Sequence, residues 1–352
     1  MQAKLSANLD VLRTVAVLLV LAHHLLRRAY FDHPWIVHLP PLGAFGVLIF
    51  FVHTCLVLMH SMQRGKLDGL PLFVDFYTRR VTRIYPLSVL AVLTAVALHL
   101  DSEVGGIPGL SRAAPVSVGR IVSNLMLVQN VVKPGSIINV LWSLPYEIQM
   151  YVFLPLLFMW TRRKRSALPG LCVLWTVSLL LAMGQRHLAT LPDQWPLIYR
   201  LTFLQFVPNF LPGVIAFVLP RVPRLNSALW PPFIFILVSV FAIRPSQGMG
   251  WALCLILGIS IPLFAEIRSG WLRVACNRIA MYSYGIYLSH QFCIWIVFAP
   301  LASLPLWGKV LVLTGLLIGV PIVLYHGIEK PMIRAGARLA ETWNPKPAMS
   351  EV

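Results

Sequence analysis

Long apolar runs separated by short polar segments dominate the chain. An α-helix needs roughly 17 to 25 mostly apolar residues to cross a bilayer. Runs of this length lie near 9–27, 42–60, 82–100, 138–160, 167–185, 199–219, 249–267, 279–298 and 309–327, with a shorter one near 228–243. The pattern predicts an all-α, polytopic membrane protein of about ten transmembrane helices.

The composition excludes the water-soluble classes. Hydrophobic residues make up 58% of the 352 residues and charged residues 12%, and the mean hydropathy is +0.77. A soluble surface needs more polar residues than this. The net charge of +17 would suit nucleic-acid binding if the basic residues formed one face, but they are scattered between apolar runs. We expect membrane lipid as the surroundings and no nucleic-acid partner.

The basic residues also predict the orientation. If the N-terminus is cytoplasmic, the inside segments hold about twice as many Lys and Arg residues as the outside segments. This favours both termini inside, in a multi-pass protein of the bacterial inner (plasma) membrane. The first run carries Arg13 and has no convincing cleavage site, so we interpret it as a retained helix. We expect one transmembrane domain, 1–335, and a short cytoplasmic tail, 336–352.

Ionisable residues inside apolar runs are the candidates for chemistry, because each costs at least about 2.5 to 3.5 kcal/mol to insert. Arg13 and His24 are eleven positions apart, or about 1100° of helix, so they share one face. Arg13 would lie toward the cytoplasm and His24 near the outer end. The alternative is a snorkelling arginine and an interfacial histidine.

Two further candidates are an arginine pair and an isolated acid. Arg80 and Arg83, in FYTRRVTRIYP, face the same way on a helix and form a pair suited to phosphate. A positive-inside cluster is the alternative, and the spacing alone favours it slightly. Glu147, in WSLPYEIQMYVFLP, is the only acid well within a predicted span, and Tyr151 one turn later shares its face. Its alternative role is a structural ion pair with an arginine.

The segment YSYGIYLSHQ places Ser283, Tyr287 and His290 on one polar helix face. We interpret His53 and Asn209, two further polar residues in apolar runs, as packing residues. The ten histidines form no HExxH-like motif, and the five cysteines form no close pair, so no metal is expected.

Six stretches together resemble the membrane acyltransferase family 3. In chain order they are LDVLRTVAVLLVLAHH, GVLIFFVHTCLVL, RRVTRIYP, WSLPYEIQMYVFLP, YSYGIYLSH and IEKP, and they extend from residue 9 to residue 331. Members of this family O-acylate surface polysaccharides, lipopolysaccharide, nodulation factors, peptidoglycan and some antibiotics. The chain departs from the pattern at His53 and Thr54, where the family usually has Ser-Gly.

The resemblance implies residue roles. The arginine-to-histidine motif of the family falls on Arg13 and His24, its double-arginine motif on Arg80 and Arg83, and its glutamate motif on Trp142, Ser143 and Glu147. His24 and Glu147 are then the catalytic candidates. His24 would deprotonate an acceptor or itself take the acyl group, and Glu147 would orient the histidine or fix an arginine. Supporting roles fall to Trp142, Ser143, Tyr151, Ser283, Tyr287 and His290.

The implied activity is an integral membrane O-acyltransferase. It would move an acyl group, with acetyl-coenzyme A as the expected donor, from the cytoplasm to a hydroxyl of an extracytoplasmic or lipid-linked glycan. Arg13, Arg80 and Arg83 would bind the coenzyme A phosphates. A transporter or flippase is the competing class, since buried Arg, His and Glu also serve as relays, and a purely structural membrane subunit is a third. We expect acceptor choice to lie in the segments 28–41, 101–137 and 186–198.

Overall fold

The computed structural model describes residues 6–30, 33, 36, 38–100, 116–132, 135–162, 167–190, 200–268 and 270–343. Within these ranges every regular element is a helix, apart from a single bridge between Leu225 and Phe264. The all-α prediction is therefore confirmed. The longer helices are α1 (Ala7–Ala29), α2 (Leu42–Gly65), α3 (Gly69–Ala97), α6 (Leu144–Arg162), α7 (Ala167–Leu188), α12 (Gly270–Phe298) and α13 (Leu306–Leu324).

The shorter elements are α4 (Val118–Leu125), α5 (Gln129–Val132), α9 (Val207–Val218), α10 (Trp230–Ile243), α11 (Gln247–Ser260) and α14 (Lys330–Trp343), together with a 3-10 turn, Asn139–Ser143, before α6. Six helical segments among the described residues are long and apolar enough to span a membrane: Ala7–Ala29, Leu42–Gly65, Gly69–Ala97, Asn139–Arg162, Ala167–Leu188 and Leu306–Trp343. Three shorter apolar helices accompany them. The polytopic character is confirmed, and the count of about ten spans stays a prediction.

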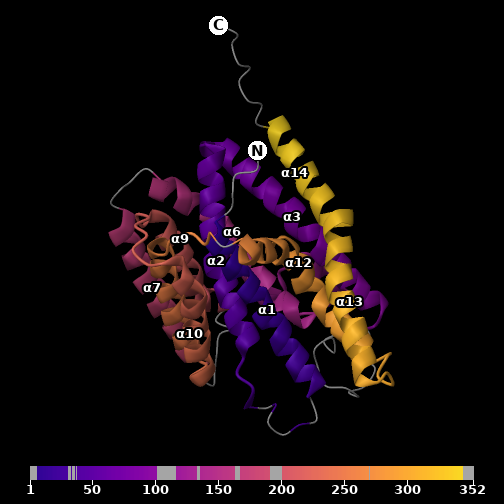
Figure 1. Ribbon diagram of the computed structural model, residues 1–352. Helices are drawn as coiled ribbons and strands as arrows, with labels where there is room; N and C mark the ends of the chain where they lie inside the picture. The colour runs from indigo at the N-terminus through magenta and orange to yellow at the C-terminus, as the bar shows by residue number, and fades with distance from the viewer. Residues whose placement is uncertain are drawn as a thin grey trace.

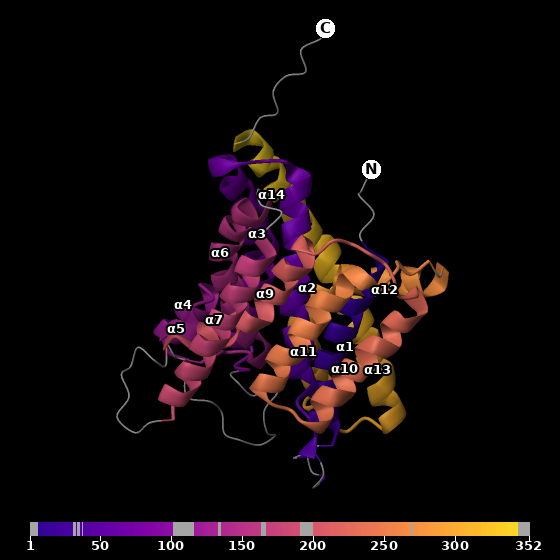
Figure 2. The same cartoon turned by 90° about the vertical axis from the view of Figure 1, so that its left-hand side faces the viewer.

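Helices α1 and α2 form the centre of the bundle (Figure 1). Helix α12 packs on α1, whereas α9 packs on α2 with α7 and α11 beyond it, as Figure 2 shows from the side. Glycines allow the backbones to approach closely. A Cβ added at Gly46 would lie 2.6 Å from the carbonyl oxygen of Ala16, and one at Gly213 would lie 2.2 Å from that of Val52. The tight contacts therefore fix α1, α2 and α9 relative to one another.

We call the end at which α1 begins and α2 ends the basal end, and the opposite one the distal end. The last turn of α14 also lies toward the basal end, which is uppermost in both views. The cytoplasmic location of the basal end remains a prediction. Helices α13 and α14 are joined without a break by a π-helical segment, Tyr325–Glu329, and α14 packs along α3. The predicted domain boundary at 335/336 lies inside α14, and residues 344–352 of the predicted tail lie outside the described residues.

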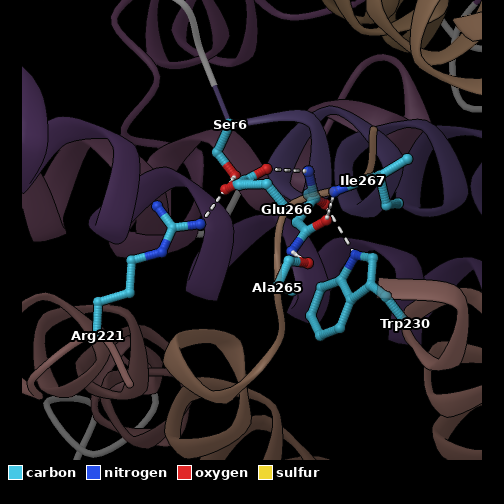
Figure 3. A network of polar contacts seen from close by, with 7 residues as sticks. Ser6, Arg221, Trp230, Ala265, Glu266 and Ile267 are labelled. Atoms are coloured by element: carbon cyan, nitrogen blue, oxygen red, sulfur yellow. Dashed lines mark hydrogen bonds and ion pairs between the residues drawn. The ribbon is translucent and has the colours of Figure 1, made fainter. Parts of the chain in front are cut away.

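A polar network anchors the basal end of α1 (Figure 3). The carboxylate of Glu266, in the segment before α12, accepts hydrogen bonds from the Ser6 hydroxyl and from the backbone N–H of Asn8, and it pairs with Arg221. The Asn8 carbonyl accepts a hydrogen bond of 3.0 Å from the indole of Trp230, which is fully buried. A carboxylate at a helix start satisfies free backbone N–H groups and complements the helix dipole. Glu266 thus caps α1 from a distant part of the chain.

This network makes a testable contribution to stability. Burial raises the pKa of the Glu266 carboxyl, but the hydrogen bonds from Ser6, Arg221 and Asn8 outweigh it and hold the pKa below its ordinary 4.5. A depressed pKa stabilises the fold above the unfolded value, and the gain is lost as the pH falls through the folded value. We expect the melting temperature of the detergent-solubilised protein to fall on acidification below about pH 4.5, and to fall less in Glu266→Gln. Glu341→Gln, at an exposed position, is the control; equal acid sensitivity of Glu266→Gln and the wild type would contradict the capping role.

Candidate functional site

A cavity of about 260 Å³ lies between α1, α2, α3, α6 and α12. Its walls include eight of the residues singled out by the sequence: Arg13, Arg80, Arg83, Ser143, Glu147, Tyr151, Ser283 and Tyr287. These residues come from four separate segments of the chain. The structure therefore brings most of the predicted site together.

The cavity is elongated along α2, which lines it from Val47 to Arg64. These residues span roughly 25 Å at 1.5 Å per residue. Arg64 belongs to the last turn of α2, so this end of the cavity is basal. A second basal cavity, of about 340 Å³, shares Val57 and Arg64 with the first, but none of the predicted site residues lines it. The first cavity is thus the candidate site.

Three of the four arginines that line the cavity are the ones singled out by the sequence. Arg13 enters from α1, and Arg80 and Arg83 enter from adjacent turns of α3. All three line a cavity inside the bundle, which favours a ligand-binding role over a snorkelling arginine and over a basic cluster at the membrane surface. Arg83 also pairs at 3.3 Å with Glu329, whose side chain is fully buried.

Glu147 lies on the α6 wall of the cavity, where its carboxylate accepts a hydrogen bond from the Tyr151 hydroxyl one turn later. Arg80 lies beside this pair. The i,i+4 geometry is the one expected from the sequence. Of the two roles suggested for Glu147, the geometry favours fixing an arginine, because the structure gives it no contact with His24.

The distal part of the cavity ends at Ser143 and Tyr287. The Tyr287 hydroxyl donates to the carbonyl of Val140 at 2.7 Å, so it accepts the hydrogen bond from Ser143, also at 2.7 Å. The Tyr287 ring packs edge-on against Phe50 on α2. Ser283, one turn earlier on α12, donates to the carbonyl of Ala280. The tyrosine is therefore held firmly between α12 and the turn before α6.

His24 does not line the cavity. Its ring lies 5.3 Å from the ring of His290, measured between centroids, and the His290 ring lies 6.4 Å from that of Tyr287. His290 is fully buried, with its Nδ1 atom 3.0 Å from the Ile286 carbonyl. His24 thus stands beyond the distal end of the cavity, and the His290 ring lies beside both His24 and Tyr287 of the cavity lining.

Trp142 also lies outside the cavity lining. Its indole ring packs 6.1 Å from the Tyr146 ring and 5.7 Å from the Phe206 ring. This contact holds the turn before α6 against the segment leading into α9. Trp142 supports the position of its neighbour Ser143 and does not face the cavity.

Sequence reasoning missed four residues of the site. His53, interpreted from the sequence as a packing residue, lines the cavity together with Tyr284 and Arg64. Tyr284 donates to the Ile84 carbonyl at 2.7 Å and so joins α12 to α3. Glu329 is 1% exposed, so Glu147 is not the only acid buried in the bundle. The available signals were the departure from the family pattern at His53 and the IEKP motif at Glu329.

The described residues contain no group of three or more His, Cys, Asp or Glu side chains that could hold a metal ion. Much of the predicted acceptor-selecting region, including 101–115 and 191–199, lies outside the described residues. The arginines that line the cavity suit anionic groups, because guanidinium groups form strong hydrogen bonds with phosphate and carboxylate oxygens.

The family model for the acyltransferase domain matches residues 6–326. The chain belongs to acyltransferase family 3. No curated protein and no solved structure shows significant similarity to it. The match extends from the capped start of α1 into the π-helical segment after α13, so it includes every helix that lines the cavity. The protein is a membrane acyltransferase, and its cavity is the candidate active site.

Proposed function

We propose that this acyltransferase transfers an acyl group, with acetyl-coenzyme A as donor, to a hydroxyl of an extracytoplasmic or lipid-linked glycan at the bacterial inner membrane. One observation carries the proposal: a single cavity holds Arg13, Arg80 and Arg83 and extends from the basal end of α2 toward His24. The positive-inside pattern favours a cytoplasmic basal end. That is the side on which acyl-coenzyme A is available.

The donor half of the site follows from the arginines. Guanidinium groups match phosphate oxygens with two parallel hydrogen bonds, and such charge-assisted bonds are among the strongest in proteins. Glu147 with Tyr151, and Glu329, are placed to hold Arg80 and Arg83 in position. The uncharged arm of coenzyme A would then extend toward Ser143 and Tyr287 and bring the thioester to the distal end of the cavity.

The acceptor half belongs to His24. The side chain is partly exposed near the distal end of α1, where a glycan hydroxyl from the outer side can approach it. Histidine is a suitable general base at neutral pH and contributes typically 10²- to 10⁴-fold. As the base takes the hydroxyl proton, the oxygen bonds to the thioester carbon, the C–S bond breaks, and the proton passes to the coenzyme A thiolate. Donor and acceptor would meet beside the His290 ring, which lies next to both Tyr287 of the cavity lining and His24.

The test uses inverted membrane vesicles, which present the cytoplasmic face to the medium. Acetyl-coenzyme A labelled in the acetyl group should release one coenzyme A thiol for each label that enters the glycan or glycolipid fraction. Vesicles from cells that lack the gene are the control. Counterflow of labelled glycan without acetylation would instead support the transporter alternative. Transfer from long-chain acyl-coenzyme A alone would overturn the acetyl assignment.

A further inference from the structure

Gln291 on α12 lies within hydrogen-bonding distance of His24. Its side chain is 2% exposed, and its Nε2 atom lies 3.3 Å from Nδ1 of His24. The other amide atom, Oε1, is buried and has no hydrogen-bond partner among the residues that the structure describes. A buried amide with an unused oxygen is costly to keep. Its contact with the histidine is therefore the feature to explain.

The amide controls which ring nitrogen of His24 carries the proton. When the NH₂ group of Gln291 faces Nδ1 of His24, it donates a hydrogen bond. Nδ1 then accepts, and the ring proton of His24 resides on its other nitrogen, the His24 Nε2. Rotation of the amide by 180° places Oε1 opposite Nδ1, which then carries the proton and donates it. In that arrangement Nε2 of His24 keeps its lone pair and can act as a base.

We propose that Gln291 is a positioning residue that holds the His24 ring and, through its amide oxygen, directs the basic lone pair of Nε2 to the acceptor hydroxyl. The inference rests on the proposed function, in which His24 is the base. With the amide in the rotated orientation, Nδ1–H of His24 donates to Oε1 of Gln291 while Nε2 of His24 takes the hydroxyl proton. The proton on Nε2 of His24 then passes to the departing thiolate. The Gln291 amide therefore gains and loses no proton.

The charges around His24 make the neutral amide distinctive. The titratable and charged groups that face the ring are His23 and Arg27 on α1 and His290 on α12. Among the described residues no carboxylate faces it, although a carboxylate occupies the orienting position in a Ser-His-Asp triad. Among the described residues, only the dipole of this amide would support the imidazolium that forms when His24 takes a proton. Replacing the amide with a carboxylate therefore adds the missing negative charge.

The experiment compares Gln291→Leu, Gln291→Glu and a matched control, Ser289→Ala. Ser289 is buried two residues earlier on α12, and its hydroxyl donates to the Gly285 carbonyl. We expect Gln291→Leu to lower kcat about 10- to 100-fold, part of what a general base contributes, with the KM for acetyl-coenzyme A within about twofold of the wild type. In Gln291→Glu the rising limb of kcat against pH should move to higher pH, with activity recovered there. Ser289→Ala should retain both properties.

Wild-type kcat and pH dependence in Gln291→Leu would overturn the inference. So would a fall in kcat for Gln291→Glu at every pH without a shift of the limb, because that pattern indicates a purely structural role. Stabilisation by coenzyme A, measured on each variant, reports whether the donor cavity is intact. Failure of the proposed function would show differently, as full activity of His24→Ala whatever the behaviour of the Gln291 variants.

Discussion

His24→Ala is expected to abolish acyl transfer while coenzyme A continues to stabilise the protein against thermal unfolding. The structure separates the two properties, because His24 lies beyond the distal end of the cavity, whereas the arginines line it. Loss of a general base removes typically 10²- to 10⁴-fold of the rate. The measurements are thiol release from acetyl-coenzyme A and the melting temperature with and without coenzyme A.

The control for this variant is His187→Ala. His187 lies in the last turn of α7 and is exposed, so its removal should leave both measurements unchanged. Full activity of His24→Ala would remove the residue from the mechanism. Loss of coenzyme A stabilisation in the same variant would place His24 in the donor site and contradict the division into donor and acceptor halves.

Arg80→Ala should produce the opposite defect, loss of donor binding. A hydrogen bond to a charged group contributes about 1.5 to 3 kcal/mol, which corresponds to a roughly 10- to 100-fold rise in the Kd for coenzyme A. The shift in melting temperature produced by coenzyme A should therefore disappear at concentrations that stabilise the wild type. Arg80 is a better choice than Arg83, because removing Arg83 leaves Glu329 buried without its partner.

Arg79→Ala is the matched control for this experiment. It removes the same charge from the neighbouring position of α3, but the Arg79 side chain is 37% exposed and pairs with Asp75 at 2.8 Å. We expect it to bind coenzyme A as the wild type does. Equal loss of binding in both variants would show that basal positive charge in general, and not the cavity, attracts the donor.

The positions of the long helices were largely predictable from the sequence. A helix that crosses lipid needs a long apolar run, and such a run is visible in a short stretch of the chain. The predicted runs at 42–60 and 167–185 became α2 and α7 with nearly the same start. The run at 82–100 was placed too late, because α3 begins at Gly69. The first half of α3 carries four charged residues, Asp75, Arg79, Arg80 and Arg83. Their polarity interrupts the apolar run, although the helix continues through them.

Local periodicity also placed Arg80 with Arg83, and Glu147 with Tyr151, correctly on shared faces, because helix geometry alone determines these relations. It placed Arg13 and His24 on one face as well. The face of a helix does not reveal how far a cavity extends along it. The lining of this cavity includes Arg13 and, from a helix more than 250 residues away in sequence, Tyr287, but it does not include His24.

The sequence by itself thus determined the membrane setting, the helical class, the family and the residue types available for chemistry, since each depends on composition, spacing or motif order. Only the tertiary structure decided that His53 and Arg64 line the cavity, that Glu329 partners Arg83, and that Gln291 contacts His24. These relations join helices that are distant in the chain. They depend on how the helices pack, as at the close approach of α9 to α2 at Gly213, and no local pattern encodes that packing.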